Sequence, residues 1–322
     1  MFGYLRFFLA FLVLLSHVGI KFYGLNPGVI AVVMFYILAG FVVSHLYMDI
    51  LPDEKNKIVL FYKDRFLRIF PLYIYICILT TIFLLLTSFG NPNFTLTKLI
   101  YNITIVPLNY YMYIDSTILT NPSWWLIPPA WSLGTELQAY VLLPFALTYK
   151  RSTIPFATIS FLVYIVANFS IINPDYFGYR FIIGVLYIFL IGSFIQQKRN
   201  NYPFLVWIVI LFMLPIFYYA DSFSPTYTKE TFIGLLVGIP IVFLLSKTKI
   251  KLPLNHILGS LSYGLFLSHF LSIWILDYYD VEINNIYLYV VYVTLLSLCI
   301  SLFGTIFVEK FANKLRFMKK TI

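Results

Sequence analysis

The stretch 3–19, GYLRFFLAFLVLLSHVG, decides how the rest of this chain is interpreted. It is an apolar run that carries one guanidinium, Arg6, and one imidazole, His17. On a helix, their separation makes about three turns and a rise of about 16 Å, so both side chains project from one face at different depths. Polar groups inside a membrane helix need a partner or a function. The stretch predicts a polar pathway through a bundle or, alternatively, a snorkelling arginine and a packed histidine.

The composition excludes a water-soluble globular protein. Hydrophobic residues make up 61% of the chain, charged residues only 11%, and the mean hydropathy is +0.88. In soluble domains about a quarter of the residues are charged. Cys77 and Cys299 both lie in apolar runs, without the spacing of a disulfide framework or a metal site, so we expect no metal. The first segment lacks the basic start and cleavage site of a signal peptide, so we expect it to be retained.

Apolar windows of spanning length recur along the chain and predict an all-α, polytopic membrane bundle of about ten transmembrane helices. We expect one transmembrane domain over residues 1–322 and no separate soluble domain. Region 90–131 is apolar but interrupted by Pro107 and Asn109, and is predicted to be a re-entrant or interfacial segment on the outer face. The windows are 2–20, 29–48, 69–89, 132–149, 153–172, 180–197, 202–220, 230–246, 257–276 and 286–307.

The distribution of positive charge predicts the orientation in the membrane. Lysines and arginines gather in alternate loops and in the C-terminal tail, at 55–68, 150–151, 198–199, 247–251 and 310–320. The opposite loops carry only Lys21, Lys98, Arg180 and Lys229. Because cytoplasmic loops are enriched in lysine and arginine, both termini are predicted to be cytoplasmic.

Two further polar residues are predicted to lie in the outer half of the bundle. Glu136 follows the sequence WSLGT near the outer end of the fourth segment, roughly level with His17. A carboxylate that orients a histidine leaves the other ring nitrogen free to act as a base. The alternative is a structural carboxylate bonded to tyrosine hydroxyls. His269 in the ninth segment either lines the same cavity or is a packed histidine.

Positive side chains are predicted at the inner side. Arg65 and Arg68 are three residues apart, so they share one face of a helix and can form a clamp of two guanidinium groups. Such a clamp suits phosphate, although anionic lipid headgroups are the alternative ligand. Together with Arg6, these residues fit a phosphorylated donor that enters from the cytoplasm and reaches an acceptor beyond His17.

At these positions the sequence resembles the membrane-bound acyltransferase family 3. The resemblance covers essentially the whole chain and implies transfer of an acyl group, usually acetyl, from cytoplasmic acyl-CoA to a hydroxyl of an extracytoplasmic or lipid-linked polysaccharide. The match is looser after the last helix, at Glu309, and we expect no counterpart of the esterase-like domain that some relatives carry. The matching pieces are Arg6 with His17, RFLR at 65–68 followed by IFPLY, WSLGTE ending at Glu136, SYGLFLSH ending at His269, and Glu309.

The resemblance also implies roles for individual residues. His17 matches the catalytic histidine, and Glu136 is expected to orient His17 or to bind the acceptor. Direct transfer and a covalent acyl-histidine relay are both left open. The positions expected to hold the CoA phosphates are Arg6, Arg65 and Arg68, and those expected to contact the acceptor are Trp131, Ser132 and His269.

The resulting hypothesis is an O-acetyltransferase with acyl-CoA (acetyl-CoA) as co-substrate and no metal, located as a multi-pass protein in the cell inner (plasma) membrane. Its expected partners are a glycan or lipid-linked saccharide and membrane lipids, but no nucleic acid. A homo-oligomer or an association with glycan-assembly machinery stays open, as does the choice between acetyl and succinyl. The alternative function is a transporter or flippase for a lipid-linked saccharide.

Overall fold

The computed structural model describes residues 1–219, 226–248, 250, 252–281 and 285–316. Four of the cations on which the predicted orientation rests lie outside the described residues, namely Lys249, Lys251, Lys319 and Lys320.

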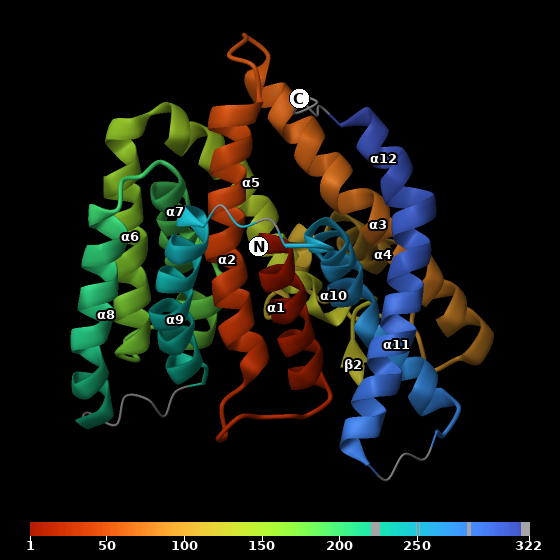
Figure 1. Cartoon of the computed structure of the whole chain (residues 1–322). Helices are drawn as coiled ribbons and strands as arrows, with labels where there is room; N and C mark the ends of the chain where they lie inside the picture. The colour runs from red at the N-terminus through yellow and green to blue at the C-terminus, as the bar shows by residue number, and fades with distance from the viewer. Residues whose placement is uncertain (220–225, 249, 251, 282–284, 317–322) are drawn as a thin grey trace.

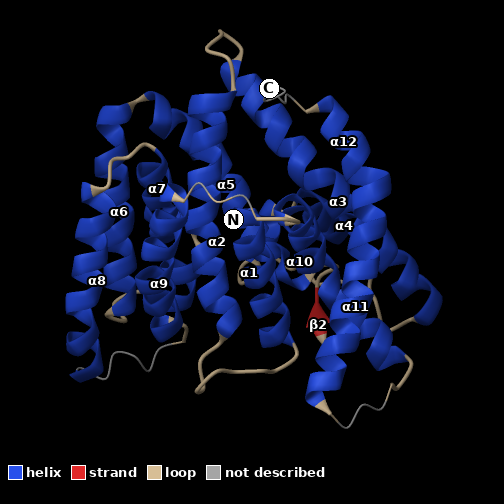
Figure 2. Cartoon of the chain, in the orientation of Figure 1, coloured by secondary structure: helices blue, strands red, loops and turns tan. Residues whose placement is uncertain are grey.

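The described chain is a bundle of helices with one two-stranded antiparallel ribbon (Figures 1 and 2). The α-helices are α1 (Phe2–His17), α2 (Pro27–His45), α3 (Lys57–Thr87), α4 (Leu96–Thr104), α5 (Trp131–Thr148), α6 (Lys150–Asn168), α7 (Ile182–Gln196), α8 (Asn201–Tyr219), α9 (Thr228–Lys247), α10 (Asn255–Tyr278), α11 (Ile286–Gly304) and α12 (Lys310–Leu315). The π-helical turns are η1 (Leu46–Ile50), η4 (Tyr176–Arg180) and η5 (Thr305–Glu309), and the 3-10 turns are η2 (Val106–Tyr110) and η3 (Pro128–Ala130). The strands are β1 (Leu119–Thr120) and β2 (Ser123–Trp124).

The prediction of an all-α membrane bundle is confirmed. Every predicted apolar window falls on a helix, and by length and composition 6 helices of the described residues could cross a membrane. Those spans are 27–50, 57–87, 176–196, 228–247, 255–278 and 286–315, with shorter apolar helices at 2–17, 153–168 and 201–217.

Region 90–131 folds into short elements instead of a long helix, as the interrupted sequence predicts. The buried Asn102 holds this region together. Its Nδ2 donates to the carbonyl of Ser116 (2.8 Å), and its Oδ1 accepts from the amide of Leu126 (2.8 Å). The Tyr73 hydroxyl of α3 donates to the Asn102 carbonyl (2.6 Å). Irregular backbone is tolerated here because protein groups satisfy its hydrogen bonds.

Glycines let two pairs of helices approach closely. A Cβ at Gly40 of α2 would lie 1.8 Å from the carbonyl oxygen of Phe189 in α7, and one at Gly192 would lie 1.9 Å from that of Ile37. On α1, the Gly3 amide donates to Asn255 Oδ1 at the start of α10 (2.9 Å). Small residues permit such contacts between membrane helices. The Gly3 contact places α1 against α10, which carries His269.

The helix α1 is shorter than its neighbours. Its 16 residues span about 24 Å, less than the roughly 30 Å of a bilayer core. In Figure 1 the loop 51–56 and α12 lie at one end of the bundle, and the loop 18–26 lies at the other. The N-terminus of α1 lies partway along α2 in the same view. Arg6, near the start of this short helix, is half-buried and lines a cavity.

Candidate active site

His17, the last residue of α1, borders a cavity of about 610 Å³ near the loop 18–26. The volume lies within the range of roughly 300–1,000 Å³ that small-molecule sites occupy. His17 is exposed although many side chains surround it, because it forms part of the wall of this open space. We call it the histidine cavity; its wall includes His17, Trp124, Trp131, Ser132, Tyr179 and Arg180.

The partner of His17 is His269. The two rings are stacked with their centroids 5.0 Å apart, and His17 Nδ1 lies 2.9 Å from His269 Nε2. His269 is fully buried, and its Nδ1 lies 3.2 Å from the carbonyl oxygen of Leu265. A carbonyl only accepts, so His269 Nδ1 carries the proton and the neutral ring accepts at Nε2. His17 then donates from Nδ1, and its Nε2 keeps a free lone pair.

The expected pairing of Glu136 with His17 is not what the structure shows. The Tyr140 hydroxyl, one turn further along α5, donates to Glu136, and Glu136 lines a different cavity. Ser132, one turn before Glu136, borders the histidine cavity. Residues four apart share a helix face but differ in depth by about 6 Å. The structure therefore agrees with the alternative of a carboxylate bonded to a tyrosine, and the orienting contact to His17 comes from His269.

The second cavity gathers the three arginines that the sequence singled out. It is narrower, about 130 Å³, and we call it the arginine cavity. Arg6 comes from α1, and Arg65 and Arg68 come from one face of α3, as their spacing predicts. The polar residues of its wall are Arg6, Tyr36, Arg65, Arg68, Ser132, Glu136, Tyr140, Ser262 and Tyr263.

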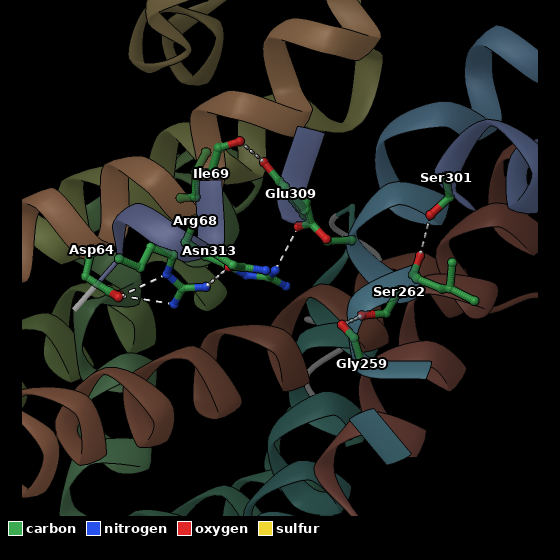
Figure 3. A network of polar contacts seen from close by, with 11 residues as sticks. Asp64, Arg68, Ile69, Gly259, Ser262, Ser301, Glu309 and Asn313 are labelled. Carbon is green, nitrogen blue, oxygen red and sulfur yellow. Dashed lines mark hydrogen bonds and ion pairs between the residues drawn. The ribbon is translucent and has the colours of Figure 1, made fainter. Parts of the chain in front are cut away.

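Two of these arginines already have carboxylate partners. Arg65 donates from Nε to Asp64 Oδ2 (3.0 Å), and Asp64 also accepts from Arg316 (3.0 Å). Arg68 Nη1 donates to Glu309 Oε1 at 2.8 Å (Figure 3). In the described part of the chain, Arg6 has neither a hydrogen bond nor an ion pair through its guanidinium. Arg6 is thus the arginine most available to a ligand.

Glu309, which matched the family pattern only loosely, has a defined place. It ends the π-helical turn η5, and its side chain is 5% exposed. The ion pair with Arg68 joins the C-terminal helices to α3. A buried carboxylate needs such a counter-charge, because removing it from water is otherwise costly.

The two cavities share part of their walls. Val32, Ser132 and Phe266 border both of them. The Ser132 hydroxyl donates to the carbonyl of Pro129 (2.9 Å), so its oxygen can still accept a hydrogen bond. The two cavities therefore adjoin at a partition made by these three residues.

A profile of the acyltransferase 3 family, described as an acyltransferase domain, matches residues 2–308. The chain belongs to the acyltransferase 3 family. This acyltransferase is therefore a multi-pass membrane protein whose histidine and arginines lie in adjoining cavities.

Two relatives of this acyltransferase show how far the similarity extends. Over 187 residues, 54% of this chain and 85% of the relative, it is 46% identical to an uncharacterized protein of Aquifex aeolicus (strain VF5). Over 126 residues, 36% of this chain and 66% of the relative, it is 31% identical to protein 2 in the picA locus of Rhizobium radiobacter. No solved structure matches the acyltransferase.

Sequence reasoning assigned Arg180 only to an outer loop, and this residue was missed as a cavity residue. The structure places it in the wall of the histidine cavity, with its guanidinium 4.2 Å from the Trp131 ring. The available signal was its position in YFGYRF, between aromatic residues and directly before an apolar run. Trp131 itself lies in the same wall.

Proposed function

We propose that this acyltransferase moves an acyl group, acetyl in the first instance, from cytoplasmic acyl-CoA to a hydroxyl of an extracytoplasmic or lipid-linked polysaccharide. One observation supports this proposal above the others: Val32, Ser132 and Phe266 form a wall common to the two cavities. A donor held by the arginines and an acceptor beside His17 would meet at this partition.

The arginine cavity suits the donor. Its small volume fits a thin pantetheine arm better than a sugar, and three guanidinium groups complement the phosphates of CoA. Asp64 and Glu309 compete with phosphate for Arg65 and Arg68, whereas Arg6 meets no such competition among the described residues. Arg6 is therefore proposed as the main phosphate ligand, and the other two supply positive potential.

The histidine pair suits general-base catalysis. His17 Nε2 takes the proton of the acceptor hydroxyl while the oxygen of that hydroxyl forms a bond to the carbonyl carbon of the thioester. Collapse of the tetrahedral intermediate breaks the bond between that carbon and sulfur, and the proton passes from His17 to the leaving thiolate. The products are an ester and free CoA. His269 accepts a hydrogen bond from His17 Nδ1 and so holds the His17 ring in the tautomer whose Nε2 carries no proton.

We place the protein in the cell inner membrane, with the loop 51–56 and the C-terminus on the cytoplasmic side. The accumulation of lysine and arginine in the loops of that side supports this orientation. The donor cavity then faces the compartment that contains acyl-CoA, and the histidine cavity faces the opposite side.

The test compares His17→Ala and His17→Gln with the matched control His256→Ala, which removes an exposed histidine near the start of α10. Each variant is expressed in cells that lack the wild-type protein. Surface glycans are analysed by mass spectrometry for ester-linked acyl groups, and acetyl-CoA turnover is measured in membranes. The His17 variants should lose both activities, and His256→Ala should keep both.

Near-normal acylation in correctly inserted His17→Ala would overturn the proposal. Movement of a lipid-linked saccharide without consumption of acyl-CoA would instead favour a flippase. Isolation of the wild-type protein with an acyl group on His17 would favour the covalent relay over direct transfer.

A further inference from the structure

Arg180 is a buried arginine in the wall of the histidine cavity. It ends the π-helical turn η4 and is 8% exposed. The Thr135 hydroxyl (2.8 Å) and Asn109 Nδ2 (3.3 Å) both donate to its backbone carbonyl, which fixes this turn against α5 and η2. Its Nε donates to Asp175 Oδ1 at 2.9 Å. The position of the guanidinium is therefore determined by the fold before any ligand binds.

Aromatic rings enclose the same guanidinium. Its central carbon lies 4.2 Å from the Trp131 ring centre, 5.2 Å from that of Tyr111, 5.4 Å from that of Tyr179 and 6.0 Å from that of Tyr227. These are cation–π distances, and such contacts hold an arginine in one orientation. Burial raises the pKa of the Tyr111 and Tyr227 phenols, so both hydroxyls remain neutral.

The terminal amino groups of Arg180 remain available. Within the described ranges, its hydrogen bonds use Nε and the backbone carbonyl, and Nη1 and Nη2 have no partner. In those ranges Arg180 is also the one lysine or arginine of the cavity wall, which contains no aspartate or glutamate. The wall also contains hydroxyl and amide side chains, among them Ser16, Asn26 and Ser123, which suit the hydroxyl groups of a sugar. Asp175 engages only Nε of Arg180, so the fixed guanidinium still offers Nη1 and Nη2 beside flat rings.

From this geometry we infer that Arg180 binds an anionic group of the acceptor, the carboxylate of an acidic sugar or a phosphate attached to a sugar, while Trp131 and the neighbouring rings pack against the sugar face. The two free terminal groups, Nη1 and Nη2, form one edge of the guanidinium that can donate two N–H bonds to the oxygens of either group. The inference rests on the proposed function, since it assigns the histidine cavity to the acceptor.

The test is a binding measurement with three probes. Detergent-purified full-length protein is titrated with methyl glucuronoside, glucose phosphate and neutral methyl glucoside, and binding is followed by the fluorescence of the tryptophans in the cavity wall. We expect wild-type protein to bind at least one anionic probe about tenfold or more tightly than the neutral one, in line with a charge-assisted hydrogen bond. The better anionic probe distinguishes a carboxylate from a phosphate.

Variants then assign the preference to Arg180. Arg180→Gln should lower the affinity for the anionic probe to that for the neutral probe and leave the neutral affinity unchanged. Lys21→Gln, which removes an exposed cation from the loop 18–26, should keep the full preference. Arg180→Lys should keep part of it, because lysine retains the charge but loses the fork of donors.

Equal affinities of the wild-type protein for charged and neutral probes would overturn the inference, even if Arg180→Gln does not fold. An unchanged preference in folded Arg180→Gln would do the same. The assay contains no acyl-CoA, so its failure is distinct from failure of the His17 test, which in turn does not depend on the charge of the acceptor.

Discussion

His17 Nδ1 lies 2.9 Å from His269 Nε2, and the carbonyl of Leu265 fixes the proton of the second ring on its far nitrogen. A buried histidine on α10 thus sets the tautomer of an exposed histidine on α1. The pair resembles a catalytic base and the carboxylate that orients it, except that the orienting group here, His269, is neutral. A neutral partner is suitable here because an unpaired carboxylate at this depth would be costly to bury.

Replacement of His269 by leucine should lower kcat about 10- to 100-fold and leave the KM for acyl-CoA unchanged, because His17 would lose the partner that holds its tautomer. His269→Gln should recover part of the rate, since an amide both accepts and donates. Steady-state acyl transfer with purified protein measures both constants. A purely structural role predicts that the two variants lose activity in proportion to their loss of folded protein.

Arg6→Gln should raise the KM for acyl-CoA about tenfold, more than Arg68→Gln does, because Arg68 is already engaged by Glu309. The effect on kcat at saturating donor should be small in both variants. Titration of acyl-CoA against the initial rate provides the measurement. An equal or larger effect at Arg68 would show that Glu309 leaves this arginine when the donor binds.

The pair formed by Arg68 and Glu309 should contribute to stability. Glu309→Leu leaves Arg68 without its partner and should destabilise the protein by about 1–3 kcal/mol. Arg68→Met together with Glu309→Leu should restore part of that loss. Unfolding of the two single variants and the double variant in mixed micelles gives the coupling energy, and simple additivity of the single effects would contradict the interaction.

Cysteine labelling should reveal the predicted orientation. In a background with Cys77→Ala and Cys299→Ala, Tyr23→Cys should react with a membrane-impermeant thiol reagent in intact cells, because Tyr23 is fully exposed in the loop 18–26. Glu54→Cys in the loop 51–56 should react only after permeabilisation. The reverse pattern would invert the orientation and would place the arginine cavity on the outer side.

Much of the candidate site followed from the sequence. Arg6 and His17 lie at different depths along α1, and Arg65 and Arg68 face one cavity, because both relations depend on spacing within a single helix. The expected contact between Glu136 and His17 was wrong, because it required the relative depth of two helices, which spacing within either helix does not fix. Arg180 was missed for a related reason: its aromatic neighbours come from separate segments.

The sequence by itself determined the class of protein, since hydropathy and charge are summed along the chain and a bilayer acts on those sums. Only the tertiary structure decided which polar groups meet. Close contacts at Gly3 and Gly40 set how far each helix is shifted and rotated against its neighbours. A shift of one helical turn is enough to move a carboxylate from one cavity to the next. The partner of His17 is therefore a consequence of helix packing.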